Sequence, residues 1–240
     1  MKKRRPRAAL TVADMNITHA PERSAAGPSA GVTAIESVTL EVPDPAAARD
    51  FYAAAFGVGP SVRLRASDAP TTGFRGFTLS VIVSQPNTVD GFIDTALAAG
   101  ATALKPAKKA PWGGYGGVVR APDGTIWKVA TSSKKNTGPA TRQIDEIVLL
   151  LGAADVKASK RFYVERGLAV AKSFGGMYVE FETPRSHVKL ALYKRTSLAK
   201  DAGVSPDGTG SHRIVIGSNA GPFTDPDGFE WESASDGALD

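Results

Sequence analysis

The sequence predicts an α+β fold made of two tandem blocks that repeat the same order of strands and helix. Three observations support this prediction: the blocks open alike, they close alike, and matching segments lie about 105–110 residues apart. Two copies are too few for a solenoid, which needs several stacked repeats. Paired modules are therefore expected, with short turns that favour mostly antiparallel strands.

Both blocks open with a strand that leads into a helix. The first opening, IESVTLEVPDPAAARDFYAAAFGV, begins at Ile35, and the second, IDEIVLLLGAADVKASKRFYVERGLAV, begins at Ile144. Apolar and polar residues alternate from Val38 to Val42, which is typical of a half-buried strand. Asp44 and Asp155 are expected to cap the helices, because a carboxylate accepts hydrogen bonds from the amides of the first turn.

Both blocks also close alike. The first ends RAPDGTIWKVA, Arg120–Ala130, and the second ends TDPDGFEWESA, Thr224–Ala234. In each ending, proline sets the entry to a tight turn and glycine accepts a positive φ. A strand that carries a tryptophan is expected to follow, and Trp127 and Trp231 are expected in the core.

Segments of linker-like composition delimit the blocks. The first 33 residues are rich in Arg, Ala, Ser, Pro and Gly without a sustained period, which predicts a disordered basic arm. The second block is trimmed, because Gly217–Gly228 leaves no room for a second helix. The predicted organisation is an arm (1–33), a first block (34–131), a linker (132–143), a trimmed second block (144–236) and a tail (237–240).

Charge and composition exclude several classes of function. The net charge of +5 comes from five positive charges within residues 2–7, so the rest of the chain is close to neutral. A nucleic-acid binder needs a basic face on its folded body, so no specific nucleic-acid partner is expected. The absence of cysteine excludes disulfides, thiolate metal sites and a cysteine nucleophile.

The chain is expected to work away from membranes. It has no apolar run of about 18 residues, the length that a membrane-spanning helix requires. The basic start is not followed by the apolar stretch of a secretory signal. A cytoplasmic location is therefore the expectation.

The helix openings with Phe-Tyr, the WGGYGG segment and both PDG-x-x-W endings resemble the vicinal oxygen chelate superfamily. This superfamily includes glyoxalase I, bleomycin-resistance proteins and extradiol dioxygenases. The resemblance covers about Ala34 to Ala234 and implies βαβββ-type modules that form open, cupped sheets of mixed or antiparallel strands. It also implies a substrate in the cup and, in metal-containing members, ligands from the first and last strands of modules.

Carrying this pattern over residue by residue leaves one candidate metal site. In the first block the ligand positions fall on Ser37 and Lys128, and an ammonium group has no lone pair for a metal. In the second block they fall on Glu146, His212 and Glu232. Such a set would suit Fe, Mn, Mg or Zn, with Glu146 as third ligand or as general base.

Structural alternatives stand beside these assignments. Glu232 could pair with a lysine or arginine, Glu146 could be exposed on an edge strand, and His212 could hydrogen-bond across strands. Trp112 and Tyr115 flank glycines and are predicted to form a mobile lid or the wall of a ligand pocket.

Two functions remain open at this point. One is a metal-dependent lyase, isomerase or dioxygenase of the glyoxalase type that acts on a small oxygenated metabolite. The alternative is a metal-free protein that sequesters a drug-like small molecule, as bleomycin-resistance proteins do. Cups in this superfamily are often completed across a dimer, so a homodimer is one expected assembly. The other is that the two blocks complete one another within one chain.

Overall fold

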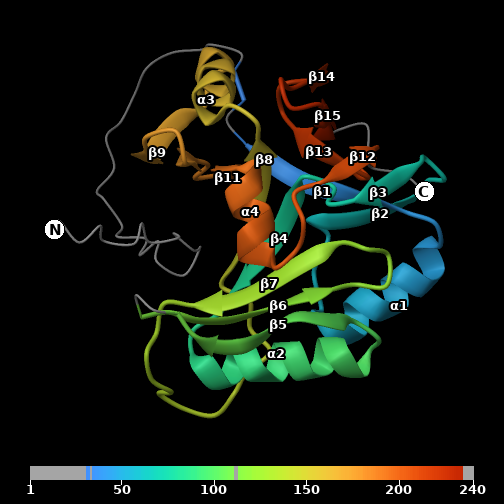
Figure 1. Cartoon of the computed structure of the whole chain (residues 1–240), viewed down its shortest axis with the longest axis vertical. Helices are drawn as coiled ribbons and strands as arrows, with labels where there is room; N and C mark the ends of the chain where they lie inside the picture. The colour runs from blue at the N-terminus through green and yellow to red at the C-terminus, as the bar shows by residue number, and fades with distance from the viewer. Residues whose placement is uncertain (1–30, 33, 111–112, 235–240) are drawn as a thin grey trace, which may run out of the picture.

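The computed structural model describes residues 31–32, 34–110 and 113–234. Most of the predicted arm, Trp112 and the predicted tail lie outside these residues. The described residues form four helices and three sheets (Figure 1). The helices are α1 (Pro45–Ala55), α2 (Pro86–Ala98), α3 (Val156–Glu165) and α4 (Arg195–Ala202).

The largest sheet has eight strands in the order β5-β6-β7-β4-β8-β11-β10-β9. Its two halves are βαβββ modules that meet where β4 and β8 pair antiparallel. In each module the first and last strands run parallel. The strands are β4 (Phe77–Ile82), β5 (Thr102–Lys109), β6 (Tyr115–Arg120), β7 (Ile126–Thr131), β8 (Glu146–Ala153), β9 (Ala169–Phe174), β10 (Tyr178–Glu182) and β11 (Val188–Lys194).

The second sheet has five strands in the order β14-β15-β13-β1-β2 and joins the two ends of the described chain. Its centre is the antiparallel pair of β1 and β13. The strands are β1 (Ile35–Val42), β2 (Val62–Ala66), β13 (Ile214–Ser218), β14 (Phe223–Thr224) and β15 (Glu230–Ser233). A small sheet pairs β3 (Thr71–Gly73) with β12 (Gly208–Gly210). Strands from the first and second halves of the sequence thus pair within one chain, and the predicted α+β fold of βαβββ modules is confirmed.

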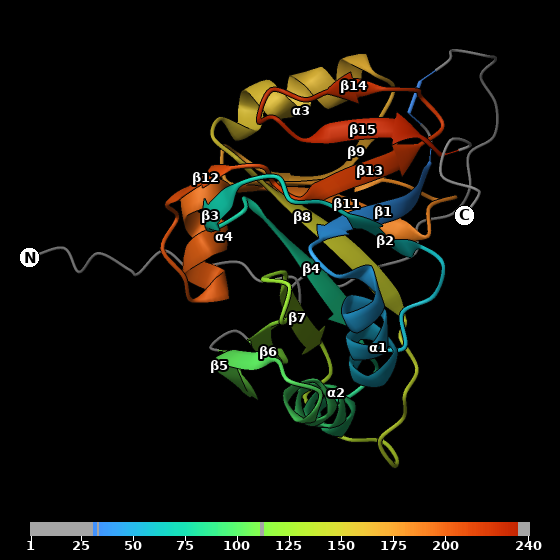
Figure 2. The ribbon, with the colours of Figure 1, turned by 90° about the vertical axis from the view of Figure 1, so that its right-hand side faces the viewer.

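One apolar core lies between the two larger sheets. Leu40 of β1 and Trp231 of β15 belong to the same buried cluster as Leu79, Leu149 and Leu190 of the eight-stranded sheet. Helices α1, α2 and α3 flank this core (Figure 2). Side chains alternate along a strand, so the opposite faces of both sheets point away from the shared core. These outward faces are where functional side chains are to be sought.

The two helix openings and the two closing turns pack together in the same way. Asp44 and Asp155 cap α1 and α3, as predicted, by accepting hydrogen bonds from first-turn amides. In each half, a tyrosine of the helix donates a hydrogen bond from its hydroxyl to an aspartate of the closing turn. In the second half, where this pair is more buried, the Tyr163 hydroxyl donates to Asp225 Oδ2 at 2.5 Å. In the first half, the Tyr52 hydroxyl donates to Asp123 Oδ2 at 2.6 Å. Each tyrosine also contacts the tryptophan of its closing strand, so both tryptophans are core residues, as expected.

No helix among the described residues combines the length and apolar composition that crossing a membrane would require.

Candidate functional site

The three predicted metal ligands lie in different parts of the fold. Glu146 begins β8 in the eight-stranded sheet, whereas Glu232 lies in β15 of the five-stranded sheet. His212 precedes β13 by two residues. Across residues 31–32, 34–110 and 113–234, no three His, Asp or Glu side chains are grouped closely enough to hold a metal ion. The structure therefore does not bring Glu146, His212 and Glu232 together.

Glu232 belongs to a polar cluster on the outward face of the five-stranded sheet. Its Oε2 atom lies 3.1 Å from Arg65 Nη1. Thr39 Oγ1 donates to its Oε1 atom at 3.4 Å. Arg65 also reaches Glu41, with 3.0 Å between Nη2 and Oε1. This arrangement is the arginine pairing that the sequence left open as the alternative for Glu232.

His212 is held between two backbone carbonyl groups. Its Nδ1 atom lies 2.5 Å from Arg75 O, and its Nε2 atom lies 3.0 Å from Asp227 O. The ring stacks on Phe229, with centroids 4.1 Å apart and planes inclined by 22°. Both ring nitrogens face hydrogen-bond acceptors, so a metal could bind only after displacing one of them.

Glu146 is half-buried and lines a cavity of about 270 Å³ together with Arg142, Asp145 and His187. Burial raises the pKa of the Glu146 carboxyl, Lys189 opposes this effect, and Glu180 adds to it. A carboxyl group with a raised pKa beside a cavity is the environment that a general base needs. Of the three predicted ligands, Glu146 alone keeps a local setting that suits the role of base.

One row of residues across the outward face of the eight-stranded sheet does not offer a ligand set for a divalent cation. The sheet register places Lys128 and Val148 on either side of Ser80, and Lys189 beside Val148. These positions lie on the first and last strands of the two modules, β4, β7, β8 and β11. Two ammonium groups, a valine and one hydroxyl cannot replace carboxylates and imidazoles. The residues of this row do not fit a metal.

Helix α4 covers part of the same face. Leu198, Ala199 and Ala202 are buried there in a second apolar cluster with Val148 and Leu150. Lys128 Nζ lies 2.8 Å from Asp201 Oδ2. Figure 1 shows α4 crossing in front of β4 and β8.

Lys105 of β5 fixes the end of the helix that covers this face. Its Nζ atom donates to Lys200 O at 2.7 Å and to Asp201 O at 2.6 Å. These bonds cap carbonyl groups of the last helical turn, of which Lys200 O also accepts from the Gly203 amide. The chain itself thus occupies part of the surface on which the resemblance places a substrate.

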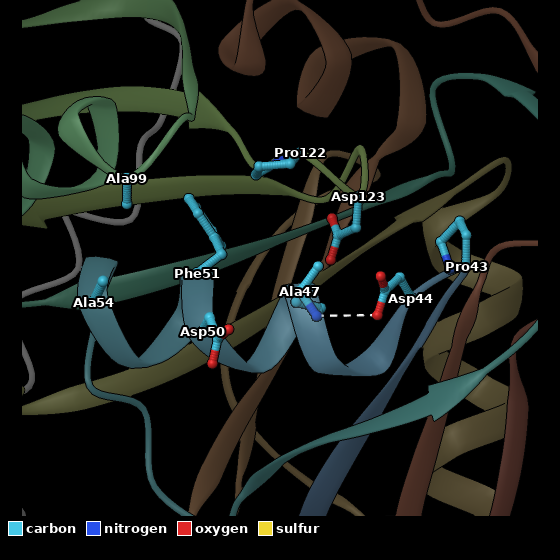
Figure 3. Close-up of a pocket in the computed structure, with 10 residues that line it drawn as sticks. Pro43, Asp44, Ala47, Asp50, Phe51, Ala54, Ala99, Pro122 and Asp123 are labelled. Carbon is cyan, nitrogen blue, oxygen red and sulfur yellow. Dashed lines mark hydrogen bonds between the residues drawn. The ribbon is translucent and has the colours of Figure 1, made fainter.

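Two further cavities remain open. One, of about 390 Å³, lies between β3, the turn after β6 and the loop that follows α4. The other, of about 650 Å³, follows the exposed side of α1 and is lined by Ala47, Phe51 and Pro122 among others (Figure 3). Figure 3 shows Asp44 and Asp123 at one end of this groove, where Asp44 is bound to the amide of Ala47.

Tyr115, predicted to line a ligand pocket, joins β6 to α2. Its hydroxyl donates to Asp90 Oδ1 at 2.7 Å. That hydrogen bond, together with burial, raises the pKa of Tyr115 to about 12. Trp112, its predicted companion, falls outside the described residues, so the lid remains a prediction.

Comparison with solved structures finds a similar architecture in glyoxalase I. Glyoxalase I from Zea mays matches with a TM-score of 0.54 and 14% sequence identity, over 84% of this chain and 92% of that chain. A glyoxalase/bleomycin resistance protein/dioxygenase family enzyme from Burkholderia phytofirmans PsJN matches 42% of this chain and 98% of its own. That match has 20% identity and a TM-score of 0.37. No family model matches, and no curated protein matches. The chain therefore has the glyoxalase-like fold.

Proposed function

We propose that this chain, whose fold is that of the glyoxalases, is a metal-free protein that binds a small organic molecule. The supporting observation is the row formed by Ser80, Lys128, Val148 and Lys189 on the outward face of the eight-stranded sheet. This row lacks carboxylate and imidazole groups. The engagement of Glu232 by Arg65 and of His212 by two carbonyl groups supports the same proposal.

The size of the cavities agrees with a small ligand. The cavities of about 270, 390 and 650 Å³ lie near or within the range of about 300–1,000 Å³ that small-molecule sites occupy. The two that adjoin the eight-stranded sheet carry polar side chains at their walls, which can orient a ligand by hydrogen bonds. A binding protein needs no more than this, because recognition requires shape and a few placed polar groups.

An acid–base enzyme that works without a metal is the second candidate. The observation in its favour is the half-buried Glu146 carboxyl beside the cavity of about 270 Å³, where burial raises its pKa. In this role Glu146 would remove a proton from a bound substrate. The neighbouring His187 and Arg142 would orient that substrate.

Metal analysis tests the proposal directly. The full-length protein is purified after growth with added Zn, Mn and Fe, and its metal content is measured beside that of Glu232→Gln. We expect far less than one equivalent of metal in both proteins. One equivalent in the wild type that is lost in Glu232→Gln would overturn the metal-free proposal and favour the metal-dependent enzyme.

Ligand binding is tested by thermal unfolding with a panel of aromatic and oxygenated small molecules. A ligand that binds only the folded state raises the midpoint of unfolding, in an amount that grows with its concentration. We expect at least one compound to do so equally well with and without a chelator. If Glu146→Gln then binds that compound normally but no longer converts it, the acid–base enzyme is the correct reading.

A further inference from the structure

The cavity of about 390 Å³ has an unusual set of walls. Two arginines, Arg75 and Arg120, line it together with the hydroxyl-bearing Thr71 and Ser205. One carboxylate, Asp207, also lines it. The cavity lies beside α4, next to the outward face of the eight-stranded sheet, because Phe74 of its wall belongs to the apolar cluster under α4.

Arg75 has hydrogen-bonding capacity that the protein does not use. Its Nη2 atom donates to Asp123 O at 2.6 Å. Its Nη1 atom is buried and has no hydrogen-bond partner within residues 31–32, 34–110 and 113–234. The nearby Asp123 carboxylate is already engaged, since its oxygens accept from the Tyr52 hydroxyl and from the Thr125 amide. Arg75 therefore binds a neutral carbonyl group and not a carboxylate.

Positive charge exceeds negative charge around Arg75, because Arg75, Arg120 and Arg213 face two carboxylates, Asp123 and Asp207. Burial lowers the pKa of the Arg75 guanidinium, Asp123 opposes this, and Arg213 and Arg120 lower it further. In the part of the chain that the structure describes, none of these three arginines forms an ion pair. The basic residues that form ion pairs there are Arg65, Lys128 and Lys172. Arg213 is buried and Arg75 is half-buried, and a buried charge without an ion-pair partner is costly, so a bound anion would stabilise this region.

A neutral donor points to the same chemistry. Thr71 Oγ1 is buried and has no hydrogen-bond partner among the described residues. A hydroxyl group can donate to an anion that two guanidinium groups already attract. The neighbouring Ser205 hydroxyl differs, because it donates to Asp207 Oδ2 at 2.7 Å. Through this bond Asp207 is held on the cavity wall.

We infer that this cavity binds the carboxylate or phosphate group of the ligand, with Arg75 and Arg120 as the charged donors and Thr71 as a neutral one. The inference rests on the proposed function, and it specifies that function: the small molecule is anionic. A guanidinium group presents two parallel N–H donors, a geometry that suits both kinds of oxyanion. Asp207 limits the affinity, because its carboxylate repels the anion.

Calorimetric titration with inorganic phosphate and with succinate, in low-salt buffer, tests the site and separates its two possible ligand groups. Arg120→Gln is the main variant, since Arg120 is exposed and its loss should leave the fold intact. We expect this change to weaken binding of the preferred anion by about tenfold or more. Arg161→Gln, on the exposed side of α3, removes the same charge away from the cavity and should leave binding unchanged.

A second pair of variants keeps the test decisive if one substitution perturbs folding. Arg75→Lys keeps the charge but loses the paired donors, and we expect it to weaken binding. Asp207→Asn removes the repulsion, and we expect it to tighten binding several-fold. Thermal unfolding of each variant without ligand identifies any that is destabilised.

The inference is overturned if neither anion binds, or if Arg120→Gln and Asp207→Asn both bind as the wild type does. Binding of neutral aromatic compounds without binding of either anion would remove this inference and leave the proposed function intact. One equivalent of tightly held metal would remove the proposed function, whatever the anions do.

Discussion

Lys128 Nζ lies 2.8 Å from Asp201 Oδ2, and this ion pair connects α4 to β7 of the eight-stranded sheet. The two side chains are only 11% and 16% exposed, so solvent screens their attraction weakly. The helix begins without a side-chain cap and ends at Gly203, whose φ of 81° stops it. Its position therefore depends on contacts with the sheet more than on its own hydrogen bonds.

Breaking the pair should destabilise the protein substantially. Lys128→Met leaves the Asp201 carboxylate without its charged partner, and Asp201→Leu does the same to Lys128. We expect each change to lower the free energy of unfolding by about 2–4 kcal/mol. Urea unfolding measures this. The control is Lys157→Met on exposed α3, for which a change within about 0.5 kcal/mol is expected.

The double variant refines this prediction. Lys128→Met combined with Asp201→Leu replaces the charged pair with an apolar one of similar size. We expect it to be more stable than either single variant, because no buried charge is left alone. Equal losses that simply add in the double variant would show that the two side chains do not interact.

The two tyrosine–aspartate contacts should differ in strength although they occupy matching places. Tyr163 is fully buried, and its partner Asp225 is 6% exposed, whereas Asp123, the partner of Tyr52, is half-buried. Tyr163→Phe should therefore cost about 2–3 kcal/mol and Tyr52→Phe about 1 kcal/mol. Phenylalanine keeps the ring packing, so urea unfolding of both variants compares the hydroxyl groups alone. A larger loss for Tyr52→Phe would contradict the role given to burial.

The stability of the protein should depend on pH through Glu146. Burial raises the pKa of this carboxyl in the folded state, so the folded protein retains the proton to higher pH than the unfolded chain does. Its contribution to stability is therefore present at low pH and is lost as pH rises past the ordinary carboxyl range. Glu146→Gln should match the wild type at low pH and become relatively more stable as pH rises.

Urea unfolding between about pH 4 and pH 8 follows this dependence. Asp145→Asn is the companion variant, because burial raises the pKa of that neighbouring carboxyl too. A Glu146→Gln profile parallel to that of the wild type at every pH would contradict the assignment. Lys189 and Glu180, the charged groups that act most strongly on Glu146, remain unchanged in both variants.

Local signals in the sequence were sufficient to predict the strand–helix openings and closing turns of the modules. The caps at Asp44 and Asp155 and the turn glycines Gly124 and Gly228 depend on residues close in sequence, and all four are found as the repeat indicates. The fold class follows from such signals because each strand–helix opening is set by its own alternation and cap. Helix α4 gave no comparable signal, since its eight residues have no side-chain cap and are held by the sheet.

The positions of the predicted site residues depend on pairing between strands that are far apart in the sequence, which local sequence patterns do not reveal. Glu146 and Glu232 belong to one block in the sequence, yet β8 pairs with β4 while β15 pairs with β13, so the two acids lie in different sheets. Likewise, the partner of Glu232 is Arg65, which is 167 residues away. The pairing of strands decides which side chains meet, and local patterns of hydrophobicity and turn residues do not reveal that pairing.

A Tyr115→Phe variant distinguishes two roles of Tyr115: lining a ligand pocket, or anchoring β6 to α2. Its hydroxyl is bound to Asp90, and its pKa is raised to about 12, so Tyr115→Phe should lower the free energy of unfolding by about 1–2 kcal/mol. Between the ordinary tyrosine pKa of about 10 and the raised value, the folded state holds the proton more tightly, so stability falls as pH rises through this interval. Tyr115→Phe should remove part of that fall, as measured by unfolding at alkaline pH. If the variant is as stable as the wild type but loses affinity for a ligand, Tyr115 lines the pocket and the anchor is of minor importance.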